Sequence, residues 1–325
     1  MHARDPKKYQ VGLLCRLFGV SKQAYYQYDE QRVLEKAARF EFAMQYVREV
    51  RAKDPGIGGV KLWHMYRSEL AGLGALGRDR FEDMLDENYL KVRPRKRKPR
   101  TTDSTHGLPT YPNIIKDFIP TAPDQLWVSD ITYIEISRID CLSSFCFLSL
   151  VLDAYTKEIV GYSIGRSLDK KYPIAALRMA MRRLRGRNGE DLHLIHHSDR
   201  GVQYASSEYI KILNDNHIRI SMTETGDPKD NAMAERINNT MKNELLNGLR
   251  FSNMDEVTEA VDRAVAFYNN ERPHMSIDMM TPAEAALCTG ELRKRWKSYR
   301  EIAIYKIRHQ KDIAEKSLPS LLRES

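Results

Sequence analysis

The sequence predicts an α/β domain with a mixed five-stranded sheet and flanking helices, preceded by an all-α region. Three observations favour this fold class. Apolar side chains recur at helical spacing through the first 90 residues, and the pattern changes at about residue 124 to short strand-like runs. Beyond that point three strands in a meander precede helix, strand, helix, strand and helix, the order of a mixed-sheet α/β domain.

Five segments follow one another along the 325 residues. A chain of this length is long enough for two domains or more. We predict a helix-turn-helix segment, a second helical segment of similar character, a basic linker, the α/β core and a C-terminal tail, at 1–36, 37–90, 91–120, 121–285 and 286–325 in that order.

The first segment contains two short helices. Apolar spacing predicts a helix over 9–18, Gly19 begins a turn, and Ser21 is a suitable N-cap for a helix over 22–28. A helix-turn-helix places its second helix in a DNA major groove, which makes Lys22 a candidate DNA contact. Structural packing of two short helices is the alternative. The second segment predicts three further helices, at 40–50, 60–70 and 78–90.

The net charge of +8 is unevenly distributed. Residues 1–120 hold 23 Lys and Arg against 15 Asp and Glu, whereas residues 121–325 hold 29 of each. All of the excess positive charge therefore precedes the core. This distribution favours a polyanion-binding region joined to a part with a different task. A solvated basic surface is the alternative.

The linker is the most basic stretch. Seven of the ten residues 91–100 are Lys or Arg, and two prolines discourage a regular helix. We interpret it as an extended segment along a phosphate backbone, with Arg95, Lys96 and Arg97 as candidate DNA contacts that make binding salt-sensitive. A disordered, solvated linker is the alternative.

Composition excludes several classes of protein. The four cysteines are scattered without a CxxC pair, which argues against a zinc module or a disulfide framework and suits a reducing cytoplasm. The uncharged stretch 141–152 is about half the roughly 20 residues that a membrane span needs. The N-terminus lacks an apolar signal segment. We expect no membrane association.

The core elements follow from apolar runs and turns. Asp153 begins a turn between the second and third strands. Strands are predicted at 126–135, 144–152, 158–164, 192–197 and 218–222, and helices at 170–185, 206–214, 231–246 and 254–269.

Two aspartates lie at informative places in these strands. Asp130 interrupts an apolar run, where a carboxylate costs several kcal/mol unless it is paired or bound to a cation. Asp199 follows the strand at 192–197, and ligand sites in α/β sheets favour that edge. A structural salt bridge at Asp130 and an ordinary turn aspartate at Asp199 are the alternatives.

The third acidic residue, Glu235, lies on the helix predicted at 231–246. Asn231, Glu235, Asn238 and Lys242 share one polar face at 3.6 residues per turn. The opposite, buried face consists of Ala234, Ile237, Met241 and Leu245. Glu235 therefore points out of the core, and Lys242, Asn231 and Asn238 are candidate DNA contacts. A solvated helix face is the alternative.

Asp130, Asp199 and Glu235 together form the candidate catalytic and metal-binding set. Three carboxylates converging from two strands and one helix can hold two hard cations, and Mg²⁺ takes carboxylate oxygens together with substrate phosphate. Two such ions about 3.5–4 Å apart activate the attacking oxygen and stabilise the leaving oxygen in phosphoryl transfer.

These three acids, with 35 residues between the second and the third, resemble the D,D-35-E signature of retroviral integrases and related transposases. The similarity is greatest to insertion-sequence transposases of the IS-three group, in their second-reading-frame (OrfB-like) product, and it extends strongly over about 120–285. The segments that carry it are 127–133, 197–204, 230–235 and 268–274. Arg200 follows Asp199 where many relatives carry Gln, a mild departure.

The resemblance implies an RNase H-like core and a DNA transposase. In such enzymes Asp130, Asp199 and Glu235 would hold two Mg²⁺ (or Mn²⁺) ions, water cuts the 3′ end of the element, and the freed 3′-OH attacks another phosphodiester. The implied partners are double-stranded DNA, as terminal inverted repeats and as target, a homo-oligomer on paired ends, and an upstream-frame OrfA-like protein. The implied location is the bacterial cytoplasm, associated with the nucleoid.

Two other functions stay open at the level of the sequence. One is a DNA-binding protein with an inactive integrase-like core, against which the intact set of three carboxylates argues. The other is an RNase H-like nuclease that only hydrolyses DNA. The basic N-terminal region favours sequence-directed DNA binding and does not exclude this second alternative.

Overall fold

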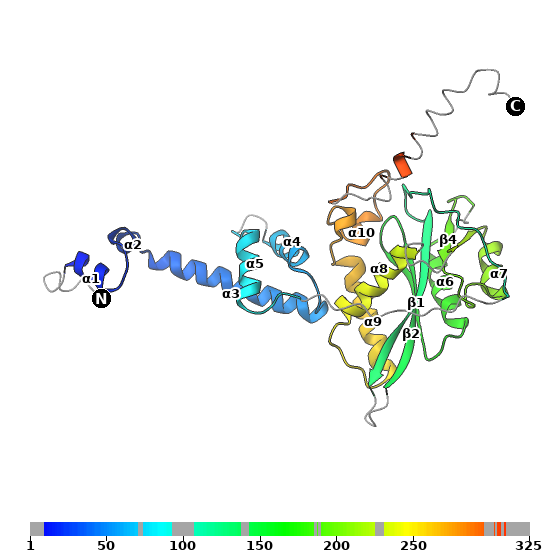
Figure 1. Cartoon of the computed structure of the whole chain (residues 1–325), viewed down its shortest axis with the longest axis horizontal. Helices are drawn as coiled ribbons and strands as arrows, with labels where there is room; N and C mark the ends of the chain where they lie inside the picture. The colour runs from blue at the N-terminus through cyan, green and yellow to red at the C-terminus, as the bar shows by residue number, and fades with distance from the viewer. Residues whose placement is uncertain are drawn as a thin grey trace, which may run out of the picture.

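One mixed sheet of five strands organises the described part of the chain. The computed structural model describes residues 10–70, 74–92, 107–137, 143–184, 187, 190–224, 231–295, 302, 304–306 and 309. The sheet has the order β3-β2-β1-β4-β5 (Figure 1). Its strands are β1 (Leu126–Ser137), β2 (Ser143–Asp153), β3 (Ile159–Gly165), β4 (Ile195–Ser198) and β5 (Arg219–Met222).

The strand pairing confirms the predicted fold class. β1, β2 and β3 form an antiparallel meander, and β4 and β5 extend the sheet in parallel from β1. This combination of a three-strand meander with two parallel strands is the RNase H-like arrangement. β4 begins at Ile195 instead of residue 192, because the preceding residues form a turn in which His193 has a φ of 51°.

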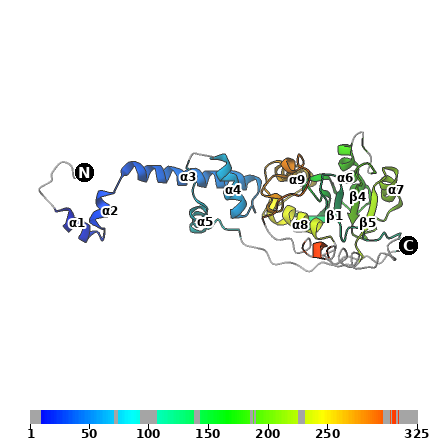
Figure 2. The ribbon, with the colours of Figure 1, turned by 90° about the horizontal axis from the view of Figure 1, so that it is seen from above.

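Helices cover both faces of the sheet (Figure 2). α6 (Lys171–Met181) and α7 (Ser207–Asp215) pack on one face, and α8 (Ala232–Thr240) and α9 (Met254–Asn270) pack on the other. Successive side chains of a strand point to opposite faces. Trp127 accordingly packs with α6, and Val128 packs with α9. The shorter elements are η1 (Arg182–Leu184), η3 (Met241–Leu245), η4 (Met275–Ile277) and α10 (Pro282–Ala285).

The first two helices lie at the end of α3 that is remote from the sheet (Figure 1). They are α1 (Val11–Leu17) and α2 (Lys22–Tyr26). Gly19, with a φ of 67°, makes the turn between them, and the Ser21 hydroxyl accepts a hydrogen bond of 3.0 Å from the Ala24 N–H. The predicted turn and N-cap are therefore confirmed.

α3 (Glu30–Lys53) is much longer than the predicted helix at 40–50. Asp29 caps its first turn by accepting from the Arg32 N–H, and neither glycine nor proline interrupts the 24 residues. The boundary predicted between residues 36 and 37 falls inside this helix. Although α3 is long, it is highly charged, and none of the helices in the described ranges is apolar enough over a sufficient length to cross a membrane.

The C-terminal half of α3 packs against α4 (Gly59–Glu69) and α5 (Arg78–Glu87). Met44 and Val47 of α3 are buried together with Tyr66 of α4 and Phe81 of α5, whose rings stack with their centroids 5.1 Å apart. The N-terminal half of α3 contributes no buried residue. α5 ends at Glu87 instead of residue 90, and Asn88 caps it by a turn.

A largely buried group of charges joins the helical region to the core. We call Asp54, Lys61, Glu244 and Arg272 the charged junction. Arg272 makes two parallel hydrogen bonds of 2.9 Å to the Glu244 carboxylate, and the Lys61 ammonium lies 3.0 Å from the same group. The Gly56 N–H also donates to the Glu244 carbonyl at 3.0 Å. The loop after α3 is therefore fixed to η3, which directly continues α8.

Candidate active site

Asp130 lies at the centre of the sheet, on β1. Its side chain is only 4% exposed and is on the face that α8 covers. One carboxylate oxygen accepts from the Ile131 N–H at 2.9 Å, and the other accepts from the Asn238 side-chain amide at 2.8 Å. Because burial of a carboxylate is costly without such donors, the amide of α8 stabilises an acidic residue in an otherwise apolar strand.

Asp199 follows β4 directly, beside Asp130. Val128 is in register with His197 across the parallel β1–β4 pair. Asp130 lies two residues beyond Val128 on β1, and Asp199 lies two residues beyond His197, directly after β4 ends at Ser198. The Asp199 carboxylate accepts from the Gly201 N–H at 3.0 Å. A Cβ atom at Gly201 would lie only 3.0 Å from that oxygen, so glycine leaves the carboxylate room to turn.

Glu235 is placed over β1 by two asparagines of its own helix. Asn231 donates to the Ser129 carbonyl at 3.1 Å, and Asn238 donates to Asp130. Asn231 is the N-cap residue that precedes α8, and Asn238 lies three residues after Glu235 on the same helical face, so Glu235 lies on the side of α8 that faces β1. The three predicted carboxylates thus come from the middle of β1, from the residue that follows the adjacent β4, and from the helix that packs on β1.

The helix that carries Glu235 differs in two respects from the prediction. Its buried face is confirmed, because Ala234, Ile237, Met241 and Leu245 are at most 3% exposed. Asn231 and Asn238, however, are themselves buried and donate to β1, where the sequence analysis expected surface positions facing DNA. The predicted single helix at 231–246 is also divided, since α8 ends at Thr240 and continues as the π-helix η3.

The chemistry of these residues suits a hard cation, although their present arrangement does not enclose one. Among the described residues, no three His, Cys, Asp or Glu side chains are grouped closely enough to hold a metal ion. The carboxylate oxygens of Asp130 and Asp199 instead accept hydrogen bonds from N–H groups of the protein. Their carboxylates, together with Glu235, are nevertheless the oxygen ligands that Mg²⁺ prefers.

Two buried amide oxygens lie at the N-cap and on the inner face of α8. The side-chain oxygens of Asn231 and Asn238 are buried and have no hydrogen-bond partner among the described residues. An ionised carboxylate can only accept, so the Asn238 nitrogen must face Asp130 and its oxygen must face away. Buried acceptors without a donor are uncommon.

Lys242 lies two helical turns beyond Glu235, as its spacing predicts. Its ammonium lies 3.5 Å from the centre of the Tyr133 ring, a cation–π contact between η3 and β1. Tyr133 is not among the residues that the sequence predicts for this site. Its position on the same strand, three residues after Asp130, is the local signal that distinguishes it.

The remaining predicted DNA contacts lie far from this site or outside the described residues. Lys22 is exposed in the first turn of α2, and its side chain folds back towards Gly12 of α1. Arg95, Lys96 and Arg97 fall outside the ranges that the structure describes.

His196 and His197 are both core residues of β4. His196 is 1% exposed, and its Nε2 atom lies 2.8 Å from the Ser129 hydroxyl and 2.9 Å from the Tyr209 hydroxyl. His197 is 2.9 Å from the Ser221 hydroxyl of β5. Burial, followed by the neighbouring His197, lowers the pKa of His196 to about 3. The neutral imidazole of His196 therefore links β4 to β1, and the ring of His197 links β4 to β5.

We expect acid to destabilise the fold through His196. In the unfolded chain the His196 imidazole binds a proton below pH 6.5, whereas in the folded chain it stays neutral down to about pH 3. Stability is therefore lost as the pH falls through this window, by about 2 kcal/mol at pH 5. We expect His196→Gln to be less stable than wild type at pH 7.5. Between pH 7.5 and pH 5, denaturant unfolding should show that its free energy of unfolding falls by about 2 kcal/mol less than that of wild type. Equal losses in the two proteins would contradict this role, and His217→Asn, at an exposed histidine, is the control.

Comparisons with known proteins identify a family of relatives. Two family models, both described as Integrase core domain, match residues 120–228 and 216–282. The chain is 33% identical over 273 residues to the insertion element IS600 uncharacterized 31 kDa protein of Shigella sonnei, covering 83% of this chain and 96% of that one. It is 29% identical over 287 residues to the transposase for insertion sequence element IS629 of Shigella sonnei, covering 86% and 92%. The HTLV-2 integrase catalytic core domain in complex with magnesium is similar over 52% of this chain and 99% of that one, with 19% identity and a TM-score of 0.39.

Proposed function

Because this chain belongs to the insertion-sequence transposases with an integrase-type core, we propose that it cleaves the 3′ ends of its element and joins them to target DNA. The observation that supports the proposal is the placement of three acidic residues on adjoining elements. Asp130 lies on β1, Asp199 directly follows the neighbouring parallel strand β4, and Glu235 lies on α8, whose Asn238 donates a hydrogen bond to Asp130.

Each residue has a defined part in this proposal. Asp130, Asp199 and Glu235 supply anionic oxygens for two Mg²⁺ or Mn²⁺ ions, which when bound activate an attacking oxygen and stabilise a leaving one. The burial of Asp130 under α8 fixes one ligand in place before DNA arrives. Water attacks the phosphodiester at the 3′ end of the element, leaving a 3′-OH on the element and a 5′-phosphate on the flanking strand. The 3′-OH then attacks a phosphodiester of the target and displaces a 3′-OH of the target strand. No side chain forms a covalent bond to DNA.

The substrate and partners follow from charge and family. The excess of eight positive charges in residues 1–120 suits double-stranded DNA, both terminal repeats and target. We place Lys22 and the linker residues Arg95, Lys96 and Arg97 along its phosphates. Joining two ends requires two active sites, so we propose a homo-oligomer on paired ends, in the bacterial cytoplasm, and keep an upstream-frame OrfA-like protein as a candidate partner.

Metal-dependent cleavage tests the proposal. A labelled duplex carrying the ends that flank this gene is incubated with the full chain in Mg²⁺, in Mn²⁺ or without a divalent ion. We expect nicks at the 3′ ends of the element only with a divalent ion. Cleavage at random positions would favour a plain nuclease. Binding without cleavage, unchanged by the upstream-frame protein, would favour an inactive core.

Lys242 is expected to bind the DNA end. Its ammonium lies on the helix of Glu235 and can pair with a phosphate next to the scissile bond. Loss of one charged hydrogen bond costs about 1.5–3 kcal/mol, so Lys242→Ala should weaken binding to the element end at least about tenfold. Titration of Mn²⁺ should show unchanged metal affinity. The control is Lys211→Ala, which removes a 74% exposed lysine on α7. Unchanged end affinity would remove this role from Lys242.

A further inference from the structure

Two aromatic rings lie side by side on the surface close to the candidate active site. Tyr133 of β1 and Phe145 of β2 are each 48% exposed, and their ring centroids are 5.4 Å apart at an interplanar angle of 86°. Phe145 is in register with Glu135, and Tyr133 with Phe147, so the two rings are diagonal neighbours on one face of the sheet.

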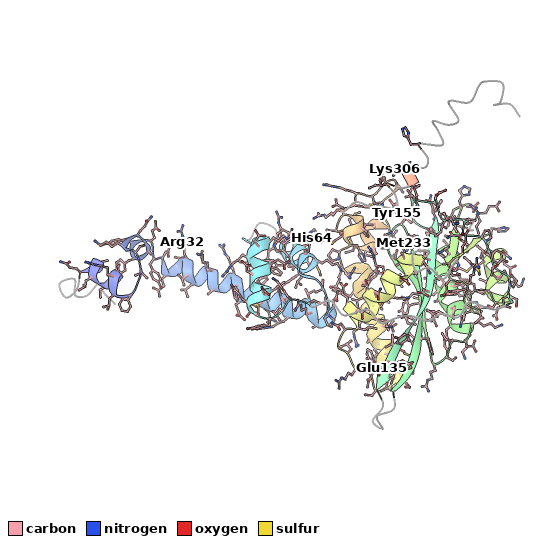
Figure 3. All side chains as sticks on the ribbon, in the orientation of Figure 1. Arg32, His64, Glu135, Tyr155, Met233 and Lys306 are labelled. Carbon is pink, nitrogen blue, oxygen red and sulfur yellow. The ribbon has the colours of Figure 1, made fainter. Side chains whose placement is uncertain are left out.

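This face is covered by helices only over part of its length. Trp127 and Val151 are buried beneath α6, but Tyr133 and Phe145 lie further along the same strands, beyond that helix. Glu135, two residues after Tyr133, lies near the far end of the β1–β2 pair (Figure 3). Single exposed apolar residues are common on proteins. Packing of the hydrophobic core does not account for two exposed aromatic rings in contact with each other, one of which carries a lysine ammonium on its face.

The cation comes from the other side of the sheet. Lys242 belongs to η3, which continues the helix that covers the Asp130 face, yet its ammonium lies 3.5 Å from the Tyr133 ring centre. It can do so because β1 has no partner strand on its β4 side beyond Val128 among the described residues. The rings therefore adjoin an open edge of β1, about 10 Å along the strand from Asp130 at roughly 3.3 Å per residue.

We infer that Tyr133, Phe145 and Lys242 form a stacking platform that binds one unpaired nucleotide at the DNA end, base on the rings and phosphate on the ammonium. Aromatic rings beside a basic group are how proteins bind single-stranded nucleic acid without regard to sequence. The inference rests on the proposed function, which brings a DNA end to Asp130.

The chemistry of the platform selects this ligand over others. Inside a duplex both faces of a base are covered by its neighbours, so only an unpaired or terminal base offers a face to a protein ring. The base takes the ring face that Lys242 now occupies, and the flexible lysine moves to the adjoining phosphate. Glu135, opposite Phe145 in register, repels phosphate and so directs it to the Lys242 side.

A fluorescent base reports this contact without any chemistry. Full-length Glu235→Gln protein is mixed with an element-end duplex that carries 2-aminopurine either at an unpaired terminal position or at an internal paired position. We expect quenching at the terminal position only. Tyr133→Leu and Phe145→Leu should each abolish this quenching and weaken binding of the unpaired end about tenfold, whereas Tyr133→Trp should retain both. Tyr89→Leu, at a 94% exposed ring elsewhere, is the matched control.

The outcomes separate this inference from the proposed function. Terminal quenching that persists in folded Tyr133→Leu and Phe145→Leu proteins would overturn the platform, even if wild type cleaves DNA. A change in oligomeric mass without a change in end affinity would assign the rings to a contact between copies and would also overturn it. Quenching that depends on the two rings, together with no cleavage of DNA by the wild-type protein in Mg²⁺, would uphold the platform and refute the transposase proposal.

Discussion

Replacing Asp130 or Asp199 by Asn, or Glu235 by Gln, is expected to lower strand cleavage at least about 1000-fold. Each change removes one negative charge from the oxygens proposed to bind two divalent cations. A metal ion contributes several kcal/mol to phosphoryl transfer, and a loss of about 4 kcal/mol corresponds to this factor. The measurement is the initial rate of 3′-end cleavage on the labelled element-end duplex, in Mg²⁺.

DNA binding is expected to survive in all three variants. Removal of a carboxylate lessens repulsion of the phosphate backbone, so the Kd should stay the same or fall slightly. Glu259→Gln is the matched control, because it makes the same change at a carboxylate of α9 that is 72% exposed. Full cleavage by any one of the three variants would show that its carboxylate is not part of the catalytic set.

Replacing Arg272 by Met is expected to lower the free energy of unfolding by about 3–5 kcal/mol. Arg272 is 4% exposed and bonds both oxygens of Glu244, and it lies 3.9 Å from Asp54, which is fully buried. Without the guanidinium two carboxylates share a buried site, and removal of one partner of a buried ion pair costs this much. Denaturant unfolding at pH 8 measures the loss.

The pH dependence of this variant provides a second check. Burial, and then the Glu244 charge, raise the pKa of Asp54 to about 7, while Arg272 opposes the shift. Because its pKa is raised, the Asp54 carboxyl keeps its proton in the folded state at pH values where the unfolded chain has lost it. The stability that this provides is fully present below pH 3.8 and is lost as the pH rises through 7. The deficit of Arg272→Met should therefore grow between pH 5 and pH 8.

Two further variants test whether the effect of Arg272→Met arises from the charged junction. Arg263→Met removes an arginine that pairs with Glu259 on the exposed surface of α9, and such pairs contribute at most about 0.5 kcal/mol. The double variant Glu244→Gln with Arg272→Met should recover part of the lost free energy of unfolding, because Glu244→Gln removes one of the carboxylates that Arg272→Met leaves without its arginine partner. A deficit in Arg272→Met no larger than that of Arg263→Met would mean that the charged junction does not hold the helical region to the core.

Local spacing explains what could be predicted from the sequence. The buried face of α8 follows from the 3.6-residue period at Ala234, Ile237 and Met241, and the strand order follows from apolar runs separated by turns. Ser21 could be recognised as a cap because its hydroxyl acts within three residues. The position of Asp130 in an apolar strand pointed to a site because a carboxylate there needs a partner.

The features that escaped prediction depend on contacts between distant parts of the chain. Asn238 is far from Asp130 in sequence, and only the docking of α8 on β1 shows that its amide faces inwards. Arg272 meets Asp54 across more than two hundred residues, so no local pattern marks the junction. The extent of α3 was underestimated because its exposed first half lacks an apolar stripe, although it also lacks any residue that would break a helix.

Strand joining by a pre-cut end tests whether Asp130, Asp199 and Glu235 form a transposase active site. A labelled element end with a free 3′-OH is mixed with target plasmid, Mg²⁺ and either wild type or Glu235→Gln, so that joining is measured apart from the first cleavage. We predict labelled plasmid with wild type and none with Glu235→Gln, although both bind the end. Joining by Glu235→Gln at the wild-type rate, or wild-type cleavage of element ends that never yields joined product, would contradict the account.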